Sequence, residues 1–189
     1  IEKRTLRRIT WRIVPFIMLL YFIAYLDRVN IGFAALTMKQ DLGFSASILG
    51  FGAGIFFWGY FMFEVPSNII LHKVGARLWI ARVMVTWGII SACMAFVEGP
   101  TSFYIMRFLL GAAEAGFFPG IILYLTFWYP PARRGQMIAI FMTATSLASI
   151  IAGPLCGAIM KWMDGINGWH GWQWLFLVQG LPASVLGIV

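Results

Sequence analysis

Charged side chains are scarce in this sequence. Of its 189 residues, 11% are charged and 61% are hydrophobic, and the mean hydropathy is +0.84. A soluble domain of ordinary composition carries ~25% charged and ~45–50% apolar residues. The shortage excludes an ordinary soluble domain and predicts a protein that crosses a membrane several times.

Cysteine and histidine are also rare, with two of each. Cys93 and Cys156 lie inside apolar runs without disulfide or zinc spacing, so we interpret them as packing residues. His72 and His170 lie close to loops, whereas an intramembrane protease or acyltransferase would need histidine near serine or aspartate at depth. The sequence therefore predicts no enzyme, no metal and no cofactor.

Six apolar runs are long enough to cross a bilayer. A hydrocarbon core of ~30 Å needs ~20 helical residues. The predicted spans cover residues 11–38, 47–71, 78–97, 102–129, 136–163 and 172–189. The longest runs imply tilt, kinks or extension beyond the lipid. The predicted fold class is an all-α membrane protein with six transmembrane helices.

The basic residues are distributed unequally between the two sets of helix ends. One set holds Lys39 and Lys161, and the other holds ten residues: Lys3, Arg4, Arg7, Arg8, Arg12, Lys73, Arg77, Arg82, Arg133 and Arg134. The positive-inside rule places the richer set, and both ends of the chain, in the cytoplasm. We therefore expect a multi-pass protein of the plasma (inner) membrane, whose net charge of +7 reflects topology and anionic-lipid contact rather than nucleic-acid binding.

Three pairs of glycines are spaced four residues apart. They are Gly50 and Gly54, Gly116 and Gly120, and Gly153 and Gly157. Such pairs allow helices to approach closely in lipid. We expect helix packing there, and a sliding surface for conformational change is the alternative.

Four charged residues share one outer-to-middle layer of the predicted spans. Asp27 and Arg28 occupy the first span, and Arg107 and Glu114 the fourth. At ~1.5 Å per residue, the first two lie ~15 Å from the outer end, Arg107 ~8 Å and Glu114 ~18 Å. A charge at the bilayer centre costs at least ~2.5–3.5 kcal/mol, so such residues need a partner or a cavity. Asp27 and Arg28 are ~100° apart around their helix and should serve different partners.

The residue types indicate two possible roles. The four charges could form fixed ion pairs between helices. Alternatively, the guanidinium forks of Arg28 and Arg107 bind a carboxylate, and the desolvated carboxyl groups of Asp27 and Glu114 load and release a proton. The second role describes an anion:proton symporter, with the proton gradient as its coupling ion.

Polar residues at similar depth extend the candidate substrate site. Tyr25 and Tyr60 are possible hydroxyl donors, although aromatic packing explains either, and Asn30 could instead hold two helices together. Glu64 lies deeper, two residues before Pro66, where Ser67 or Asn68 could satisfy the freed backbone group. We interpret Glu64 as a gate or structural residue rather than a substrate contact.

Three motifs resemble the N-terminal half of the major facilitator superfamily, and more narrowly its anion:cation symporter family. Residues 25–30 read Tyr-Leu-Asp-Arg-Val-Asn, residues 107–114 read Arg-Phe-Leu-Leu-Gly-Ala-Ala-Glu, and residues 63–68 read Phe-Glu-Val-Pro-Ser-Asn. The resemblance implies six of twelve helices, arranged as two three-helix inverted repeats. It also implies proton-coupled uptake of a carboxylate such as a sugar acid, a dicarboxylate or an aromatic acid.

The resemblance assigns roles to individual residues. It gives proton handling to Asp27 and Glu114, and substrate binding or coupling to Arg28, Tyr60 and Arg107. The superfamily's loop motif is kept at Gly75 and Arg77, whereas Asn68 replaces its first glycine and His72 its aspartate. Glu64 is therefore the candidate that replaces the usual aspartate latch, and Asn68, Gly75 and Arg77 complete the expected gate.

The rest of the transport site is expected outside this chain. A small organic anion, a proton and the lipid bilayer are the expected partners, together with the C-terminal half of the same transporter. An organic phosphate:phosphate antiporter is the main alternative, and Asp27 and Glu114 argue against it because anion exchange needs no proton carrier. A channel or structural subunit is a further alternative.

Overall fold

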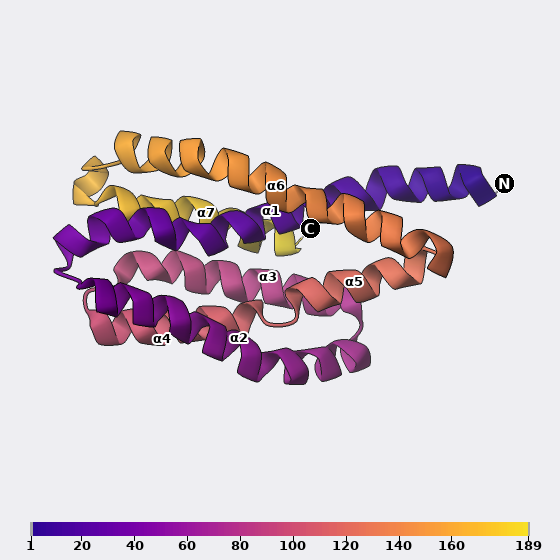
Figure 1. Ribbon diagram of the computed structural model, residues 1–189, viewed down its shortest axis with the longest axis horizontal. Coiled ribbons are helices and arrows are strands. Elements are labelled where there is room, and N and C mark those ends of the chain that lie inside the picture. The colour runs from indigo at the N-terminus through magenta and orange to yellow at the C-terminus, as the bar shows by residue number, and fades with distance from the viewer. Residues whose placement is uncertain (1, 189) are drawn as a thin grey trace.

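The computed structural model describes the backbone of residues 2–188 and the side chains of residues 8–188, and within that part it contains helices and no strand. The α-helices are α1 (Glu2–Asp41), α2 (Ala46–Val74), α3 (Ala76–Cys93), α4 (Pro100–Glu114), α5 (Phe117–Trp128), α6 (Pro131–Trp162) and α7 (Gly171–Ile188). Two short 3₁₀ helices, η1 (Met94–Phe96) and η2 (Ile166–Gly168), precede α4 and α7. The helices run side by side along one axis (Figure 1). The predicted all-α fold class is therefore confirmed.

Five helical segments are long and apolar enough to cross a membrane. They are Arg8–Asp41, Ala46–Val74, Ala76–Phe96, Pro100–Trp128 and Pro131–Trp162. The predicted sixth span, 172–189, corresponds to α7. Within the described residues, α7 is not among the five segments, and residue 189 lies outside the described residues.

The predicted span 102–129 is interrupted, which corrects the expectation of one continuous helix. α4 ends at Glu114, and α5 begins at Phe117. Ala115 has an extended ψ of 128°, and Gly116 has a φ of 87° in the left-handed region, which glycine adopts without steric cost. The sequence pattern missed the break because apolar residues continue on both sides of it.

The helix contacts follow a two-fold pattern. The most extensive contacts join α3 with α7, α2 with α4, and α1 with α6. If the span formed by α4 and α5 is equivalent to α1, then α6 matches α2 and α7 matches α3. The α2–α4 contact then maps onto the α6–α1 contact, as two related three-helix repeats require.

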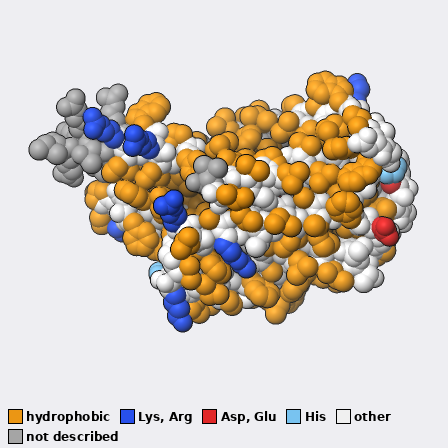
Figure 2. All heavy atoms as spheres, turned by 180° about the vertical axis from the view of Figure 1, so that it is seen from behind, with side chains coloured by type: hydrophobic (Ala, Val, Ile, Leu, Met, Phe, Trp, Pro, Cys, Tyr) orange, Lys and Arg blue, Asp and Glu red, His pale blue; other side chains and the backbone are white. Residues whose placement is uncertain are grey.

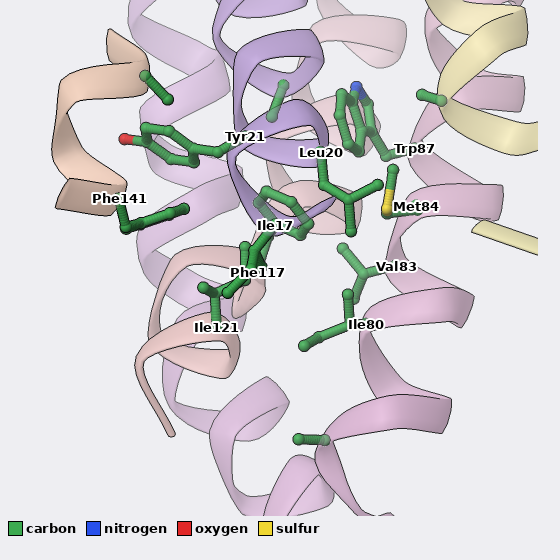
Figure 3. Close-up of a cluster of buried hydrophobic side chains, with 14 of the residues drawn as sticks. Ile17, Leu20, Tyr21, Ile80, Val83, Met84, Trp87, Phe117, Ile121 and Phe141 are labelled. Atoms are coloured by element: carbon green, nitrogen blue, oxygen red, sulfur yellow. The ribbon is translucent and has the colours of Figure 1, made fainter. Parts of the chain in front are cut away.

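Two hydrophobic clusters fill the bundle. The first includes Tyr21, Trp87, Phe117 and Phe141 (Figure 3), in which the Tyr21 and Phe141 rings lie 4.6 Å apart between centroids. The second includes Met38, Phe44, Phe103, Trp172 and Phe176. Along α1, the first cluster reaches Ala24 and the second begins at Ala34. The buried Asp27 and Asn30 lie between them, so the bundle contains a polar layer.

Two helices approach each other closely at Gly59 and Gly111, which belong to none of the predicted pairs. A Cβ on Gly59 would lie 2.3 Å from the Phe108 carbonyl oxygen, and one on Gly111 would lie 2.0 Å from the Phe56 carbonyl oxygen. These two glycines therefore allow α2 and α4 to pack backbone against backbone.

The predicted glycine pairs behave differently from one another. Gly116 and Gly120 do pack, against Ser67 and Leu71 respectively. The other two pairs have no neighbouring atoms within the described chain, so their packing role stays a prediction: Gly50, Gly54, Gly153 and Gly157.

Charged residues separate along the long axis of the bundle. Figure 2 shows most of the visible Lys and Arg side chains toward one end and the visible Asp and Glu side chains at the other, which is also the end of Lys39 and Lys161. The basic end carries Arg12, the α2–α3 turn and the α5–α6 turn. The side chains of Lys3, Arg4 and Arg7, which were part of the predicted basic set, lie outside the described residues.

Candidate functional site

An ion pair joins α1 to α4 in the polar layer. Arg28 Nη2 donates to Glu114 Oε2 at 2.6 Å, and Arg28 Nε donates to the same oxygen at 3.3 Å. The Glu114 side chain is 2% accessible, whereas the Arg28 side chain is 33% accessible. The guanidinium of Arg28 also lies 5.4 Å from the centre of the Tyr60 ring. Arg28 thus remains open to a ligand while Glu114 is enclosed.

Arg107 lies on the same helix as Glu114, two turns earlier. It is 3% exposed, its Nε donates to the carbonyl oxygen of Gly52 at 3.2 Å, and its guanidinium carbon lies 4.7 Å from the Phe56 ring centre. The Arg28 guanidinium lies 5.8 Å from the same ring. Both cations therefore lie close to the same aromatic ring, which places them in one region of the bundle.

Unused hydrogen-bonding atoms remain in this region. Among the described residues, Arg107 Nη1 and Glu114 Oε1 are buried without a partner, as is Asn30 Oδ1. A buried polar atom without a partner costs ~1–3 kcal/mol, so such atoms commonly mark places where a ligand or water binds. The site thus combines a spare donor on one cation with an accessible second cation.

Asp27 points away from this site. It is 0% exposed and accepts hydrogen bonds from Asn30 Nδ2 at 2.9 Å, from Trp87 Nε1 at 2.6 Å and from Ser91 Oγ. Trp87 and Ser91 are one turn apart on α3, so both reach the same carboxylate. The prediction that Asp27 and Arg28 serve different partners is confirmed.

The break after Glu114 is held by side chains from two other helices. Ser67 Oγ donates to the Ala115 carbonyl oxygen at 2.7 Å, and Trp79 Nε1 donates to Ser67 Oγ at 2.9 Å. Ser67 therefore satisfies the end of α4 rather than the α2 backbone near Pro66, which leaves Asn68 as the remaining candidate for that backbone group. The arrangement fixes the end of the helix that carries Glu114.

The remaining candidate substrate residues are placed unevenly. Tyr60 lies beside Arg28, whereas Asn30 donates to Asp27 on its own helix. Tyr25 is half-buried, and the described residues give it no hydrogen bond. The structure thus brings together Arg28, Tyr60, Arg107 and Glu114, and leaves Asn30 in the Asp27 cluster.

The predicted gate residues lie toward the basic end. Glu64 and Asn68 are half-buried on α2, and no ion pair joins Glu64 to another described residue. Gly75, with a φ of 94°, forms the α2–α3 turn, and Arg77 is exposed in the first turn of α3. Their gating role remains a prediction.

Several site residues were missed by sequence reasoning. Phe56, Trp79, Trp87 and Ser91 contact the charged groups or help to fix the helix break, whereas Ser67 was named but given a different role. The one-turn spacing of Trp87 and Ser91 was a possible signal, because a serine and an indole on one face of an apolar helix need a common acceptor. The other contacts depend on helix packing that no local pattern specifies.

The histidines and cysteines lie outside the ion-pair site. His170 Nδ1 lies 3.3 Å from Asp41 Oδ2 at the acidic end, and His72 is exposed near the α2–α3 turn. Within the described residues, no three His, Cys, Asp or Glu side chains form a group that could hold a metal.

Comparison with known proteins agrees with this architecture. The sequence is 68% identical over 189 residues to a protein of Agrobacterium vitis named as a tartrate transporter. This match covers 100% of this chain and 42% of that protein. It is 58% identical over 187 residues to a protein of Pseudomonas putida named as metabolite transport protein NicT, covering 99% and 43% respectively. The chain thus spans about two fifths of the length of these relatives.

The same fold is found among solved structures. A bacterial homolog of the human lysosomal transporter Spinster, in an inward-facing and occupied conformation, superposes with a TM-score of 0.80 at 21% identity. The match covers 94% of this chain and 42% of that protein. The model of the Major Facilitator Superfamily matches residues 17–189. The chain therefore belongs to the Major Facilitator Superfamily.

Proposed function

We propose that the full-length protein is a proton-coupled symporter of an organic carboxylate. The observation that carries this proposal is the Arg28–Glu114 ion pair, in which the cation is accessible and the carboxylate is enclosed. In such a pair, the substrate anion can bind the accessible guanidinium of Arg28. The carboxylate of Glu114 competes with the substrate for the same guanidinium. The names of the two relatives support an organic metabolite, and one of them supports a dicarboxylate.

Proton coupling follows from competition for Arg28. Ionised Glu114 occupies two donors of the guanidinium, Nη2 and Nε. When Glu114 takes up a proton, its charge is lost and these donors become free to bind a substrate carboxylate in a two-pronged geometry. When the substrate leaves, Glu114 releases the proton and the ion pair forms again.

Arg107 supplies the second cation. Its Nη1 is buried and has no partner among the described residues, so a second carboxylate or a hydroxyl of the substrate can accept from it once the site opens, without competing with a hydrogen bond inside the protein. Phe56 lies against both guanidinium groups and limits their movement, and Tyr60 adds a hydroxyl next to Arg28. Tyr25 remains a possible substrate donor, and Asn30 acts through Asp27.

Asp27 is proposed as a secondary proton site. Both of its oxygens already accept hydrogen bonds, from Trp87 on one and from Asn30 and Ser91 on the other, and protonation would weaken these contacts. Glu114, by contrast, has an unused oxygen that can take up a proton. We therefore assign the main coupling step to Glu114.

Alternating access requires a second bundle. We propose that the C-terminal half of the same transporter packs against the open faces of α2 and α6, where Gly50, Gly54, Gly153 and Gly157 have no neighbours in this chain. The gate would then form at the basic end from Glu64, Asn68, Gly75 and Arg77. Rocking of the two bundles about the arginine site would expose the substrate to one side of the membrane at a time.

The orientation is also a proposal. The basic end carries the exposed Arg12, Arg77 and Arg133, so the positive-inside rule places this end, with both ends of the chain, in the cytoplasm. The site would then open toward the periplasm or the cytoplasm of a bacterial inner membrane in alternation.

Uptake into proteoliposomes that contain the full-length protein tests the function. With labelled tartrate as the probe, an inward proton gradient should drive accumulation, and a protonophore should abolish it. Accumulation that ignores the protonophore and needs phosphate inside the vesicles would support the phosphate antiporter instead. Ionic conductance without saturable uptake would support a channel.

A further inference from the structure

A cavity lies at the basic end of the bundle, apart from the Arg28–Glu114 site. Its volume is about 790 Å³, within the ~300–1,000 Å³ range typical of small-molecule sites. The walls come from the first half of α1, the start of α3, the end of α5 and the end of α7. None of the residues of the ion-pair site lines it, so it needs an explanation of its own.

The only charged side chains among the described lining residues are two arginines. Arg12 extends from α1 and Arg77 from the first turn of α3, and the part of the chain whose side chains are described contributes no aspartate or glutamate to the lining. Within the described residues, neither guanidinium has an ion pair or a hydrogen bond. The two cations therefore offer a binding place for an anionic group.

The remaining walls are almost entirely apolar. Leu78 is 65% exposed and Phe127 69% exposed, and Phe16 and Leu186 also line the cavity. A small water-soluble anion would leave these walls uncovered, whereas a molecule with an anionic head and an apolar tail would satisfy both parts of the cavity.

The position of the cavity indicates the source of such a molecule. It lies at the ends of spanning helices, next to Trp11, which is 73% exposed and of a residue type that concentrates at membrane interfaces. Both repeats contribute walls, α1 and α3 from one and α5 and α7 from the other. A ligand that enters from the bilayer at this level is a lipid.

We propose that this cavity binds one anionic glycerophospholipid. Its phosphate contacts Arg12 and Arg77, and an acyl chain lies along Phe16, Leu78 and Phe127. The bound lipid links the two repeats at the end of the bundle that carries Gly75 and Arg77. This site does not depend on which substrate is transported.

Lipid retention by the purified full-length protein tests the proposal. The probes are phosphatidylglycerol and phosphatidylcholine with identical acyl chains, and native mass spectrometry measures the lipid that remains after detergent exchange. We expect one phosphatidylglycerol to be retained in preference to phosphatidylcholine. The double variant Arg12→Ala/Arg77→Ala should bind it about 30-fold more weakly, as expected for two phosphate-facing cations.

Two further variants separate the cavity from general attraction to the basic end. The pair Lys73→Ala/Arg133→Ala removes the same charge from residues that do not line the cavity, and should keep wild-type retention. Ala81→Trp, which places a large side chain in the apolar wall, should reduce retention without changing the charge. The proposal is overturned if the control pair loses as much lipid as the arginine pair, or if Ala81→Trp keeps it all.

A photo-crosslinking amino acid at position 78 gives a second measurement that needs no loss of charge. In wild-type background and in membranes with both lipids, it should crosslink to phosphatidylglycerol. Crosslinks to the protein's own polypeptide would show that another segment fills the cavity and would overturn the proposal. Equal crosslinking to the two lipids would do the same.

Discussion

Arg28 and Glu114 form an ion pair in which the two side chains are buried to very different extents. The atoms Nη2 and Oε2 lie 2.6 Å apart, across α1 and α4, and the accessible fractions of the side chains are 33% and 2%. Loss of the arginine would leave a carboxylate inside the protein without a counter-charge. Loss of the carboxylate would leave a guanidinium that can still reach solvent.

This asymmetry predicts unequal effects on stability. Arg28→Ala should lower the free energy of unfolding by about 3 kcal/mol, the lower end of the ~3–5 kcal/mol range for a broken buried pair, because Arg28 is partly exposed. Arg28→Ala/Glu114→Gln should recover most of that loss, since it removes the unpaired charge. Thermal unfolding of the full-length protein in detergent measures both. A double variant no more stable than Arg28→Ala would show that the ion pair contributes little.

Glu114→Gln should separate substrate exchange from proton coupling. The glutamine cannot ionise, so Arg28 remains available to the substrate at all times and no proton is carried with it. We expect counterflow of labelled substrate to continue while accumulation driven by a proton gradient falls to the level of vesicles without protein.

The control for this experiment is Glu64→Gln, which removes the carboxylate of α2 that has no ion pair with a described residue. It should keep gradient-driven accumulation, although its rate can change if Glu64 belongs to the gate. Full pH-dependent accumulation by Glu114→Gln would exclude the proposed coupling role of Glu114.

The sequence was sufficient to predict the fold class and the charged layer. Apolar runs of suitable length specify spanning helices, and a charge among them is conspicuous because its insertion is costly. The different directions of Asp27 and Arg28 also follow from helical geometry alone. These features are local, so a single chain without its neighbours displays them.

Features that depend on contacts between helices were not predictable. The Ala115–Gly116 break is fixed by Ser67 and Trp79 from other helices, and no composition change marks it. Likewise, Gly59 and Gly111 mediate the closest α2–α4 approach, whereas the regularly spaced Gly50 and Gly54 face open space. Spacing reveals which residues share a helix face, but which face meets a partner is decided by the whole bundle.

Glycine substitutions on these two faces should therefore differ sharply. Gly111→Ala places a methyl group 2.0 Å from the Phe56 carbonyl oxygen, which is backbone and cannot rotate away. We expect separation of α2 from α4 at a cost of about 1–3 kcal/mol. The expected fall in melting temperature is accompanied by weaker substrate binding, because Arg107 and Glu114 lie on the displaced helix.

Gly54→Ala is the matched control, because no atom lies within 4 Å of the added Cβ. In this half of the protein it should be neutral in stability, or slightly favourable through helix propensity. If it impairs transport in the full-length protein while leaving the melting temperature unchanged, the face of α2 that carries Gly54 contacts the second bundle. Equal destabilisation by both variants would contradict the observed packing of α2 on α4.

The Asp27 cluster predicts a role for Trp87 in stability. Trp87→Phe removes the indole N–H that donates to Asp27 Oδ2 and leaves that oxygen buried, at a cost of about 1–3 kcal/mol. Trp58→Phe, at a residue 67% exposed, is the control and should change little. Thermal unfolding distinguishes the two, and an unchanged melting temperature for Trp87→Phe would show that Asp27 does not depend on this donor.

The topology gives the last prediction. Lys39 lies in the last turn of α1 and Arg133 at the start of α6, at opposite ends of the bundle. In a background without Cys93 and Cys156, single cysteines at these positions should react with a membrane-impermeant maleimide from opposite sides. We expect the cysteine at position 39 to be labelled in intact cells and that at position 133 only after the membrane is opened.

Two further positions check the assignment of the ends. A cysteine in place of Asp164 should be labelled from the same side as position 39, and one in place of Lys73 from the same side as position 133, because each shares its end of the bundle. Labelling of positions 39 and 133 from one side would contradict the six-span arrangement, whereas labelling with the sides exchanged would retain it and reverse the proposed orientation.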